Sequence, residues 1–322
     1  MRRREFLTLL GGAAAALPLS ARAQEQSLPL IGFMGVGPFA GPDIRRGLAD
    51  SGFVQGRDFR AEYRWAEFDP KQMAAQAADL VQRGASVIVT IAQSEALAAK
   101  GATRSIPVIF MTSADPVEIG LVESLNRPGG NLTGFYGLGT GLIAKRLEIL
   151  HELVPTANSI AYLSNPTDAA TTEIETRELQ VAARILGVKL IFLNARDEGA
   201  LVEAYDTVAR ERTGALIVSA TLLFFTRRNE LAAFSASYKV PTIYAAREYA
   251  ESGGLVSFGA RGSDARYLSG VYAARILKGE KPSELPVQQI TKTELVVNLQ
   301  TAKELGLTVP PTLLARADEV IE

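Results

Sequence analysis

The 322-residue sequence has no cysteine and a single histidine, His151. The absence of cysteine excludes disulfides, thiolate metal sites, cysteine nucleophiles and a lipid-modified N-terminal cysteine. One histidine cannot supply a His-rich metal site, so the sequence predicts no metal site. His151 itself, just before Pro155, is predicted to be a solvated or helix-capping residue.

The sequence also has no excess of either charge and no basic run, with a formal net charge of −1. Such a protein is a poor nucleic-acid binder, and no nucleic-acid partner is expected. Its length exceeds what one hydrophobic core usually supports, which favours about two domains. The apolar content of 47% is typical of a globular protein.

Phosphate-binding motifs are lacking as well. No Gly-x-x-x-x-Gly-Lys-Ser/Thr occurs, which argues against ATP hydrolysis. Gly35, Gly37 and Gly41 follow an apolar run, but their spacing is one residue too long for a dinucleotide loop, and Pro38 removes an amide donor. The interpretation preferred over nucleotide binding is a loop that lets a ligand approach the backbone, with no cofactor.

The longest uncharged stretch near the N-terminus, residues 6–19, is shorter than the roughly 20 residues of a membrane span. Residues 3–7 (RREFL) resemble a twin-arginine signal, with a general secretory signal as the alternative. Ala21-Arg22-Ala23 has the pattern of a cleavage site. We therefore expect a signal peptide over residues 1–23, cleavage after Ala23 and a periplasmic protein. Cleavage removes four arginines and one glutamate, so the net charge becomes about −4.

Two stretches of the chain resemble one another. Residues 106–116 (IPVIFMTSADP) are echoed by residues 240–248 (VPTIYAARE), and the preceding runs 85–90 (ASVIVT) and 214–219 (GALIVS) are also alike. Each pair reads as two buried strands, the second of which ends in a polar loop. Chance resemblance of short apolar runs is the alternative. The echo favours two similar α/β halves whose strand ends face one another across a cleft.

Strands and helices alternate along the whole mature chain, which indicates βαβ units and parallel sheets. The pattern predicts two Rossmann-like doubly wound lobes joined by a multi-strand hinge. The predicted N-terminal lobe is residues 28–138 plus 262–285, and the C-terminal lobe is residues 139–261 plus 286–322. Strands are expected at residues 28–34, 58–65, 87–91, 106–116, 159–163, 188–193, 216–219, 242–244 and 255–258. Ser94 is expected to cap a helix that reaches about Lys100.

Polar residues in the loops after these strands are the candidate ligand-binding residues, because open α/β sheets bind ligands at the carboxyl ends of their strands. The candidates are Gly37, Phe39, Gln93, Ser94, Thr112, Ser113, Asp115, Ser164, Asn165, Thr167, Thr221, Tyr244 and Glu248. The alternative for Asp115-Pro116 and Asn165-Pro166 is that they only cap helices or shape turns.

Paired acids are the remaining chemical candidates. Glu173 with Glu175, and Glu248 with Glu251, have spacings that suit solvated helix faces better than acid–base catalysis. We therefore predict no catalytic residue.

Five ordered stretches together resemble the ABC transporter substrate-binding protein family of the tryptophan/tyrosine-uptake type. They are residues 106–116, 127–134 (RPGGNLTG), 253–259 (GGLVSFG), 276–282 (ILKGEKP) and 307–321 (LTVPPTLLARADEVI). The family's Asp-Pro after the fourth strand matches Asp115-Pro116. Its small-residue loop after the third strand matches residues 92–94, where Gln93 is bulkier than expected.

The resemblance implies a type I periplasmic-binding-protein fold and a non-enzymatic receptor. Such a receptor captures a small polar ligand, such as an aromatic amino acid, in the interlobe cleft by hinge closure and delivers it to an ABC permease in the inner membrane. For an amino acid, Asp115 or Glu248 would bind the ammonium group, and Ser94, Ser113 and Thr167 the carboxylate. We expect a monomer.

Two alternatives to this receptor stay open at this point. The first is an exported α/β enzyme that acts on a nucleotide or a sugar. The second is a ligand-sensing partner of a membrane receptor.

Overall fold

The computed structural model describes residues 28–35, 41–65, 69–137 and 141–322. The predicted signal peptide and the candidate residues Gly37 and Phe39 lie outside these ranges. The chain forms two compact units. Unit 1 comprises the residues up to Met111, Pro116–Phe135 and Ala265–Gln288; unit 2 comprises Thr112–Asp115, Tyr136–Asp264 and Gln289–Glu322.

Unit 1 is built on a six-stranded sheet with the strand order β11-β5-β4-β3-β1-β2. β1 is parallel to β2 and β3, and β3 is parallel to β4. Its elements are β1 (Leu30–Met34), α2 (Gly41–Asp50), β2 (Arg60–Arg64), α3 (Pro70–Gln82), β3 (Ala85–Thr90), α4 (Gln93–Ala102), β4 (Val108–Thr112), β5 (Leu132–Tyr136), α11 (Gly262–Leu277), the 3₁₀ turn Pro282–Glu284 and β11 (Gln288–Gln289).

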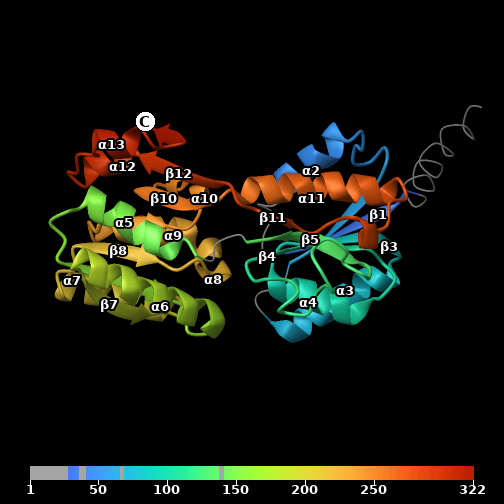
Figure 1. The fold of residues 1–322 in the computed structure, drawn as a ribbon, viewed down its shortest axis with the longest axis horizontal. Helices are drawn as coiled ribbons and strands as arrows, with labels where there is room; N and C mark the ends of the chain where they lie inside the picture. The colour runs from blue at the N-terminus through green and yellow to red at the C-terminus, as the bar shows by residue number, and fades with distance from the viewer. Residues whose placement is uncertain (1–27, 36–40, 66–68, 138–140) are drawn as a thin grey trace, which may run out of the picture. The chain divides into compact units, whose positions relative to one another are not determined.

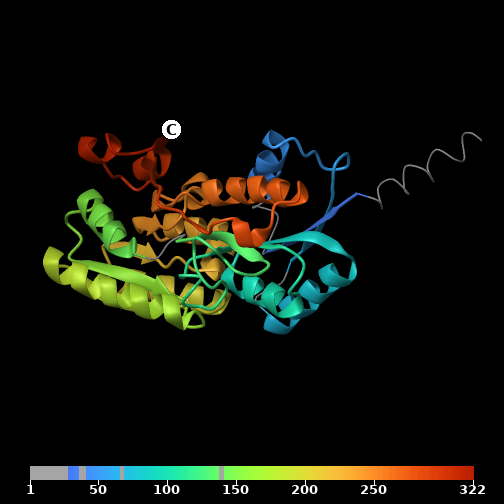
Figure 2. The ribbon, with the colours of Figure 1, turned by 45° about the vertical axis from the view of Figure 1, so that its right-hand side comes forward.

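Helices cover both faces of this sheet: α2 and α11 lie on one side and α3 and α4 on the other (Figures 1 and 2). Glycines allow close contact on each side. A Cβ atom at Gly47 would lie 2.0 Å from the Tyr267 carbonyl oxygen, so α2 and α11 touch through their backbones. On the other face, a Cβ atom at Gly32 would lie 2.7 Å from Leu80 of α3. The doubly wound arrangement predicted from the alternation is confirmed for this unit.

Unit 2 is built on a seven-stranded sheet with the order β13-β12-β10-β9-β8-β6-β7. β12 is antiparallel to β10, whereas β10 with β9, β9 with β8, β8 with β6, β6 with β7 and β12 with β13 pair in parallel. Its elements are α5 (Ile143–Leu153), β6 (Ser159–Ser164), α6 (Ala169–Leu186), β7 (Lys189–Asn194), α7 (Glu198–Arg210), β8 (Ala215–Val218), α8 (Leu222–Thr226), α9 (Arg228–Ser237), β9 (Thr242–Tyr244), α10 (Arg247–Glu251), β10 (Val256–Ala260), β12 (Thr293–Asn298), α12 (Leu299–Glu304), α13 (Pro311–Leu314) and β13 (Glu319–Ile321).

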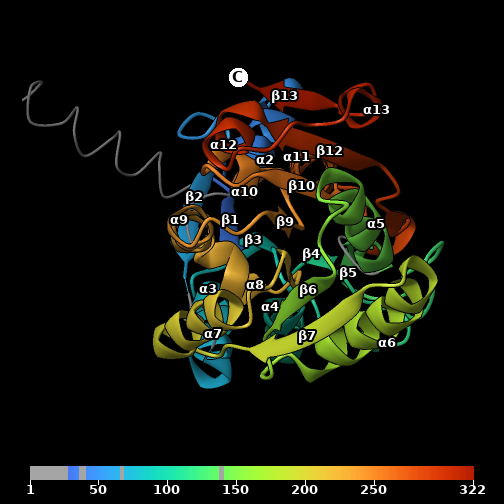
Figure 3. The same ribbon diagram turned by 90° about the vertical axis from the view of Figure 1, so that its left-hand side faces the viewer.

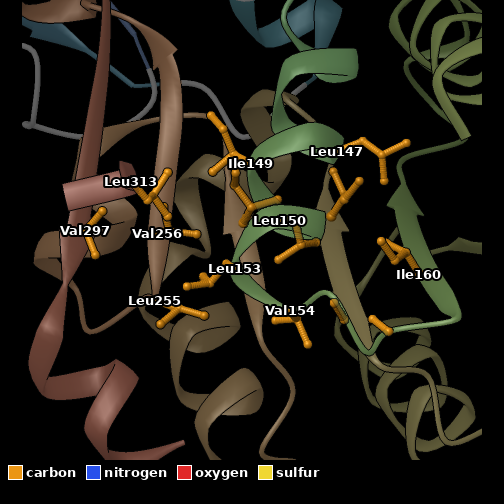
Figure 4. Close-up of a cluster of buried hydrophobic side chains, with 14 of the residues drawn as sticks. Leu147, Ile149, Leu150, Leu153, Val154, Ile160, Leu255, Val256, Val297 and Leu313 are labelled. Atoms are coloured by element: carbon orange, nitrogen blue, oxygen red, sulfur yellow. The ribbon is translucent and has the colours of Figure 1, made fainter. Parts of the chain in front are cut away.

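The unit 2 sheet has an apolar core on each face. On one face, α5 and α6 bury leucines such as Leu147, Leu150 and Leu179 against alternate residues of β6, β8, β9, β10 and β12 (Figure 4). On the other face, α7, α8, α9 and α10 pack on side chains of β6, β7, β8 and β9, and Figure 3 shows these helices and α6 around the sheet. The central strands are therefore buried on both faces, as parallel strands usually are.

The echo between the two halves is confirmed. β3 pairs with β4, with Ile88 opposite Val108, and β8 pairs with β9, with Leu216 opposite Thr242. The proline before each second strand has the same role: the Pro107 oxygen accepts from Ile88 N at 2.9 Å, and the Pro241 oxygen accepts from Leu216 N at 2.8 Å. β4 and β9 are thus the fourth strands of their respective units.

Two local predictions were wrong. α4 is capped at Ala92, one residue before the helix, so Ser94 lies inside its first turn. Two short helices of five residues each, α8 and α10, follow β8 and β9 directly, where the candidates Thr221 and Glu248 were predicted to lie in loops. No helix in the described part of the chain is long and apolar enough to cross a membrane.

Candidate functional site

The first group of candidates follows two neighbouring parallel strands of the six-stranded sheet, β3 and β4. Gln93 and Ser94 come after β3, Thr112 ends β4, and Ser113 and Asp115 follow it. The carboxyl ends of β3 and β4 meet at one edge of the sheet, so the structure brings these five residues to the same edge. The Thr112 Oγ1 atom accepts from Ala114 N at 3.2 Å, which shapes the turn that carries Ser113 and Asp115.

Glu95 lies at the same edge and was not predicted. Its side chain is 1% exposed, and one carboxylate oxygen, Oε2, accepts from Ile91 N at 3.1 Å and Ala92 N at 3.2 Å. The other oxygen, Oε1, and the buried Thr90 Oγ1 have no hydrogen-bond partner among the described residues. Burial raises the pKa of Glu95 to about 7, although the two amides favour the ionised form. Residues 91 and 92, which lead into Gln93 and α4, are thus held by a carboxyl group whose pKa is raised to near neutral pH.

The unit 2 candidates also follow neighbouring parallel strands. Ser164 ends β6, Asn165 and Thr167 follow it, Thr221 follows β8, and Glu248 lies in α10 after β9. The structure therefore brings these five residues to the carboxyl edge of the sheet, where ligands bind in open α/β folds.

The loop after β6 is shaped by its own side chains. Asn165 Oδ1 accepts from Thr167 N at 3.1 Å and from Thr167 Oγ1 at 2.8 Å, which is an Asx turn. Ser164 Oγ lies 2.7 Å from Asn194 Oδ1. At the start of α6, the Asp168 side chain accepts from Thr171 N at 3.3 Å, so this helix end already has an anionic cap. These bonds fix the loop, and a role in ligand binding stays a prediction for its residues.

Tyr244 is placed differently from the other candidates. Its side chain is 0% exposed, its ring stacks on Tyr249 at 4.6 Å between centroids, and its Oη lies 2.8 Å from Ser235 Oγ. The structure places Tyr244 in the core of unit 2 and does not bring its ring to the loops. Phe225 of α8 is half-buried and contacts Tyr249 edge-on, with 6.0 Å between ring centroids. It lies near Thr221, because Phe225 N donates to the Thr221 carbonyl oxygen at 3.1 Å.

An ion pair that sequence reasoning missed lies beneath this edge. Arg146 of α5 is 0% exposed and Glu175 of α6 is 2% exposed, with Arg146 Nη1 3.4 Å from Glu175 Oε1. Glu175 Oε2 also accepts from Tyr162 Oη at 2.7 Å and from Ser219 Oγ at 2.5 Å. Burial lowers the pKa of Arg146, and attraction to Glu175 opposes the decrease.

The interpretation of Glu173 and Glu175 as a solvated pair was therefore wrong for Glu175. Glu173 is exposed, whereas Glu175 lies four residues before Leu179 on the buried face of α6. Arg146 likewise lies four residues before Leu150 on the buried face of α5. The signal was available in the sequence: each charged residue continues the apolar stripe of its helix.

A second charged cluster connects α10 with the last strands. Arg247 contacts Glu319 at 2.7 Å and the buried Glu294 at 3.3 Å, and Arg261 lies 3.6 Å from Glu294. Burial raises the pKa of Glu294, and the two arginines oppose the rise. The cluster fixes α10, and with it Glu248, against β12 and β13.

The described residues contain no group of three or more His, Cys, Asp or Glu side chains placed to hold a metal ion. The residues that the structure brings together at the two sheet edges are hydroxyls, amides and carboxylates. Such groups can form several hydrogen bonds to a small polar ligand that carries a positive and a negative group.

Comparison with known proteins gives consistent results. Residues 41–321 match the family described as ABC transporter substrate binding protein. The chain is 27% identical over 268 residues to a tyrosine-binding protein of Clostridioides difficile (strain R20291), which covers 81% of this chain and 75% of the relative.

Solved structures are similar over nearly the whole chain. A conserved domain protein from Vibrio cholerae O1 biovar El Tor strain N16961 is 28% identical with a TM-score of 0.78, covering 91% of this chain and 100% of that protein. An ABC domain from Streptococcus pneumoniae in complex with L-Trp is 24% identical with a TM-score of 0.79, covering 92% and 100%. At that identity the second likeness shows the fold alone, and it agrees with the two-unit α/β architecture predicted from the sequence.

Proposed function

Because the chain belongs to the ABC transporter substrate-binding protein family, we propose that it binds an amino acid, of the aromatic class, and presents it to an ABC permease in the inner membrane. The observation that carries the proposal is the set of hydroxyls and carboxylates at the carboxyl edges of both sheets. The relative named as tyrosine-binding supports the ligand class.

In this proposal acids and hydroxyls at the strand ends of both sheets bind the charged groups of the ligand. Asp115 or Glu248 binds the ammonium group of the ligand. Ser94, Ser113 and Thr167 bind the carboxylate. A charge-assisted hydrogen bond of this kind contributes about 1.5–3 kcal/mol.

The remaining candidates complete the site in the proposal. Gln93, Thr112, Ser164, Asn165 and Thr221 supply further hydrogen bonds or shape the loops that do so. Gly37 and Phe39 belong to the proposal on sequence grounds only, and Tyr244 acts from within the core as packing for α10.

The proposal also covers location and activity. We propose that the protein is exported, is cleaved after Ala23, acts in the periplasm as a monomer and catalyses no reaction. Members of its family are binding proteins, and the strand-end groups described above suit binding without a need for a nucleophile or general base.

A thermal-shift panel tests the function. The exported protein, purified from the periplasm and freed of ligand by unfolding, dialysis and refolding, is heated with L-tyrosine, L-tryptophan, L-phenylalanine, L-leucine, purine nucleosides and simple sugars. A ligand at 100 times its Kd stabilises the folded protein by about 2.7 kcal/mol. We expect stabilisation by one or more aromatic amino acids without chemical change of the compound. Turnover of a nucleoside or sugar would instead support an enzyme, and stabilisation by none of the amino acids would refute the proposal.

A further inference from the structure

The Arg146–Glu175 pair connects several strand ends of unit 2. Glu175 accepts from Tyr162 of β6 and from Ser219 just after β8, and its Oε1 lies 3.4 Å from Ala220 N. Arg146 Nε donates to the Phe258 oxygen of β10 at 2.8 Å. One buried pair therefore links α5 and α6 to β6, β8 and β10.

Core stability alone does not account for this pair. Two charges removed from water have a large desolvation cost, and apolar residues of similar volume often replace a buried ion pair without loss of stability. The pair is also incompletely satisfied, because Arg146 Nη2 has no hydrogen-bond partner among the described residues. An arrangement that is costly and still incomplete indicates a role other than holding the core together.

The contacts of Glu175 show which segment the pair controls. Ser219 and Ala220 begin the loop from β8 to α8, and Thr221 ends it, where its carbonyl oxygen accepts from Phe225 N at 3.1 Å. Glu175 contacts the two residues directly before Thr221, at 2.5 Å to Ser219 Oγ and 3.4 Å to Ala220 N. Thr221 Oγ1 is itself buried and has no hydrogen-bond partner among the described residues.

We infer that Arg146 and Glu175 are positioning residues for the ligand site: they hold residues 219–221 in the conformation that presents Thr221 and α8 at the sheet edge. Arg146 fixes the Glu175 carboxylate from one side while Tyr162 fixes it from another, so its two oxygens stay directed at the loop. This inference rests on the proposed function, because the loop matters only where that edge binds ligand.

The central variant replaces both charges at once, with Arg146→Met and Glu175→Leu together, so that no unpaired charge stays in the core. We expect it to fold with an unfolding midpoint close to that of the wild type. We also expect its Kd for L-tyrosine or L-tryptophan, whichever the wild type binds, to be at least tenfold higher. Amide hydrogen exchange in residues 219–226 should be at least tenfold faster than in the wild type, and this measurement needs no ligand.

Two single substitutions provide a matched comparison that preserves folding. Tyr162→Phe removes a buried hydroxyl that bonds Glu175, and Tyr205→Phe removes a buried hydroxyl that contacts Ser235 on the other face of the sheet. Only Tyr162→Phe should accelerate exchange in residues 219–226 and raise the Kd. If the double variant does not fold, the comparison of Tyr162→Phe with Tyr205→Phe and the variant Ser219→Ala test the inference instead.

The outcomes separate the inference from the proposed function. A wild-type protein that binds no amino acid refutes the proposed function, while faster exchange of the loop in the variants still supports the positioning of residues 219–221. A wild-type protein that binds, together with variants that fold, bind equally well and exchange equally slowly in residues 219–226, overturns the inference.

Discussion

Replacing Glu95 with glutamine is predicted to change how the stability of the protein depends on pH. The Glu95 side chain is 1% exposed, and burial raises its pKa from the ordinary 4.5 to about 7. Glutamine has the same shape, and its Oε1 can still accept from the Ile91 and Ala92 amides. The substitution therefore removes the ionisation and keeps the hydrogen bonds that shape the loop.

The sign follows from the raised pKa. The folded state favours the neutral Glu95 carboxyl. Below pH 4.5 the carboxyl is protonated in both the folded and the unfolded state, so its ionisation does not change the stability of the protein. Between pH 4.5 and about 7 the unfolded chain loses the proton while the folded protein keeps it, and stability falls as the pH rises. Above pH 7 the loss is constant, at about 3 kcal/mol from 1.36 kcal/mol per pH unit of difference. We expect Glu95→Gln and the wild type to be similar near pH 5, and the variant to be more stable at pH 8 by up to about 3 kcal/mol.

Urea unfolding from pH 5 to pH 8.5, followed by tryptophan fluorescence, is a suitable assay. Trp65 is the single tryptophan and stacks on Tyr63 at 5.5 Å between centroids, so it reports on unit 1, which contains Glu95. Glu284→Gln is the control, because Glu284 is an exposed acid of the same unit. The reasoning would be refuted if Glu95→Gln changed stability by the same amount at pH 5 and at pH 8.

Two further predictions concern the site and the packing of unit 1. Asp115→Ala should raise the Kd for the amino-acid ligand by about 10- to 100-fold, the loss of one charge-assisted hydrogen bond, with the unfolding midpoint little changed. Asp206→Ala, at an exposed position, serves as its control in the same calorimetric titration. Unchanged affinity of Asp115→Ala would indicate that Asp115 only shapes the turn. Gly47→Ala should destabilise unit 1 by about 1–3 kcal/mol in urea, because the new Cβ atom would lie 2.0 Å from the Tyr267 oxygen. Gly101→Ala in α4, with nothing within 4 Å, should be neutral or stabilising, and equal effects of the two substitutions would contradict the close helix contact.

Much of the fold was predictable because its signals are local. The alternation of apolar runs with capped helices predicted β1 to β4 of unit 1 and β6 to β10 of unit 2, and residues 242–244 were predicted without error as β9. The two short helices were missed because five residues complete little more than one turn and show no helical periodicity. The stretch 222–226 (LLFFT) is almost wholly apolar, so no face can be distinguished in it.

The position of the candidate site in the fold could be predicted from the sequence better than the side chains that line it. Strand order in a parallel sheet places the loops after β3, β4, β6 and β8 at carboxyl edges, which follows from topology. The direction of Tyr244 did not follow, because β9 is buried on both faces and alternation does not reveal which side a residue takes. Glu95, Arg146 and Glu175 were missed because charged residues are usually solvated. For Arg146 and Glu175 the apolar stripe of the helix indicated burial, but their partners are known only from the tertiary contacts.

Isothermal titration calorimetry of the ligand-free protein with L-tyrosine and L-tryptophan tests the central claim most directly. We predict saturable binding of at least one of them, with one amino acid per chain and no change in the amino acid recovered after the titration. Absence of saturable binding for both amino acids would contradict the account.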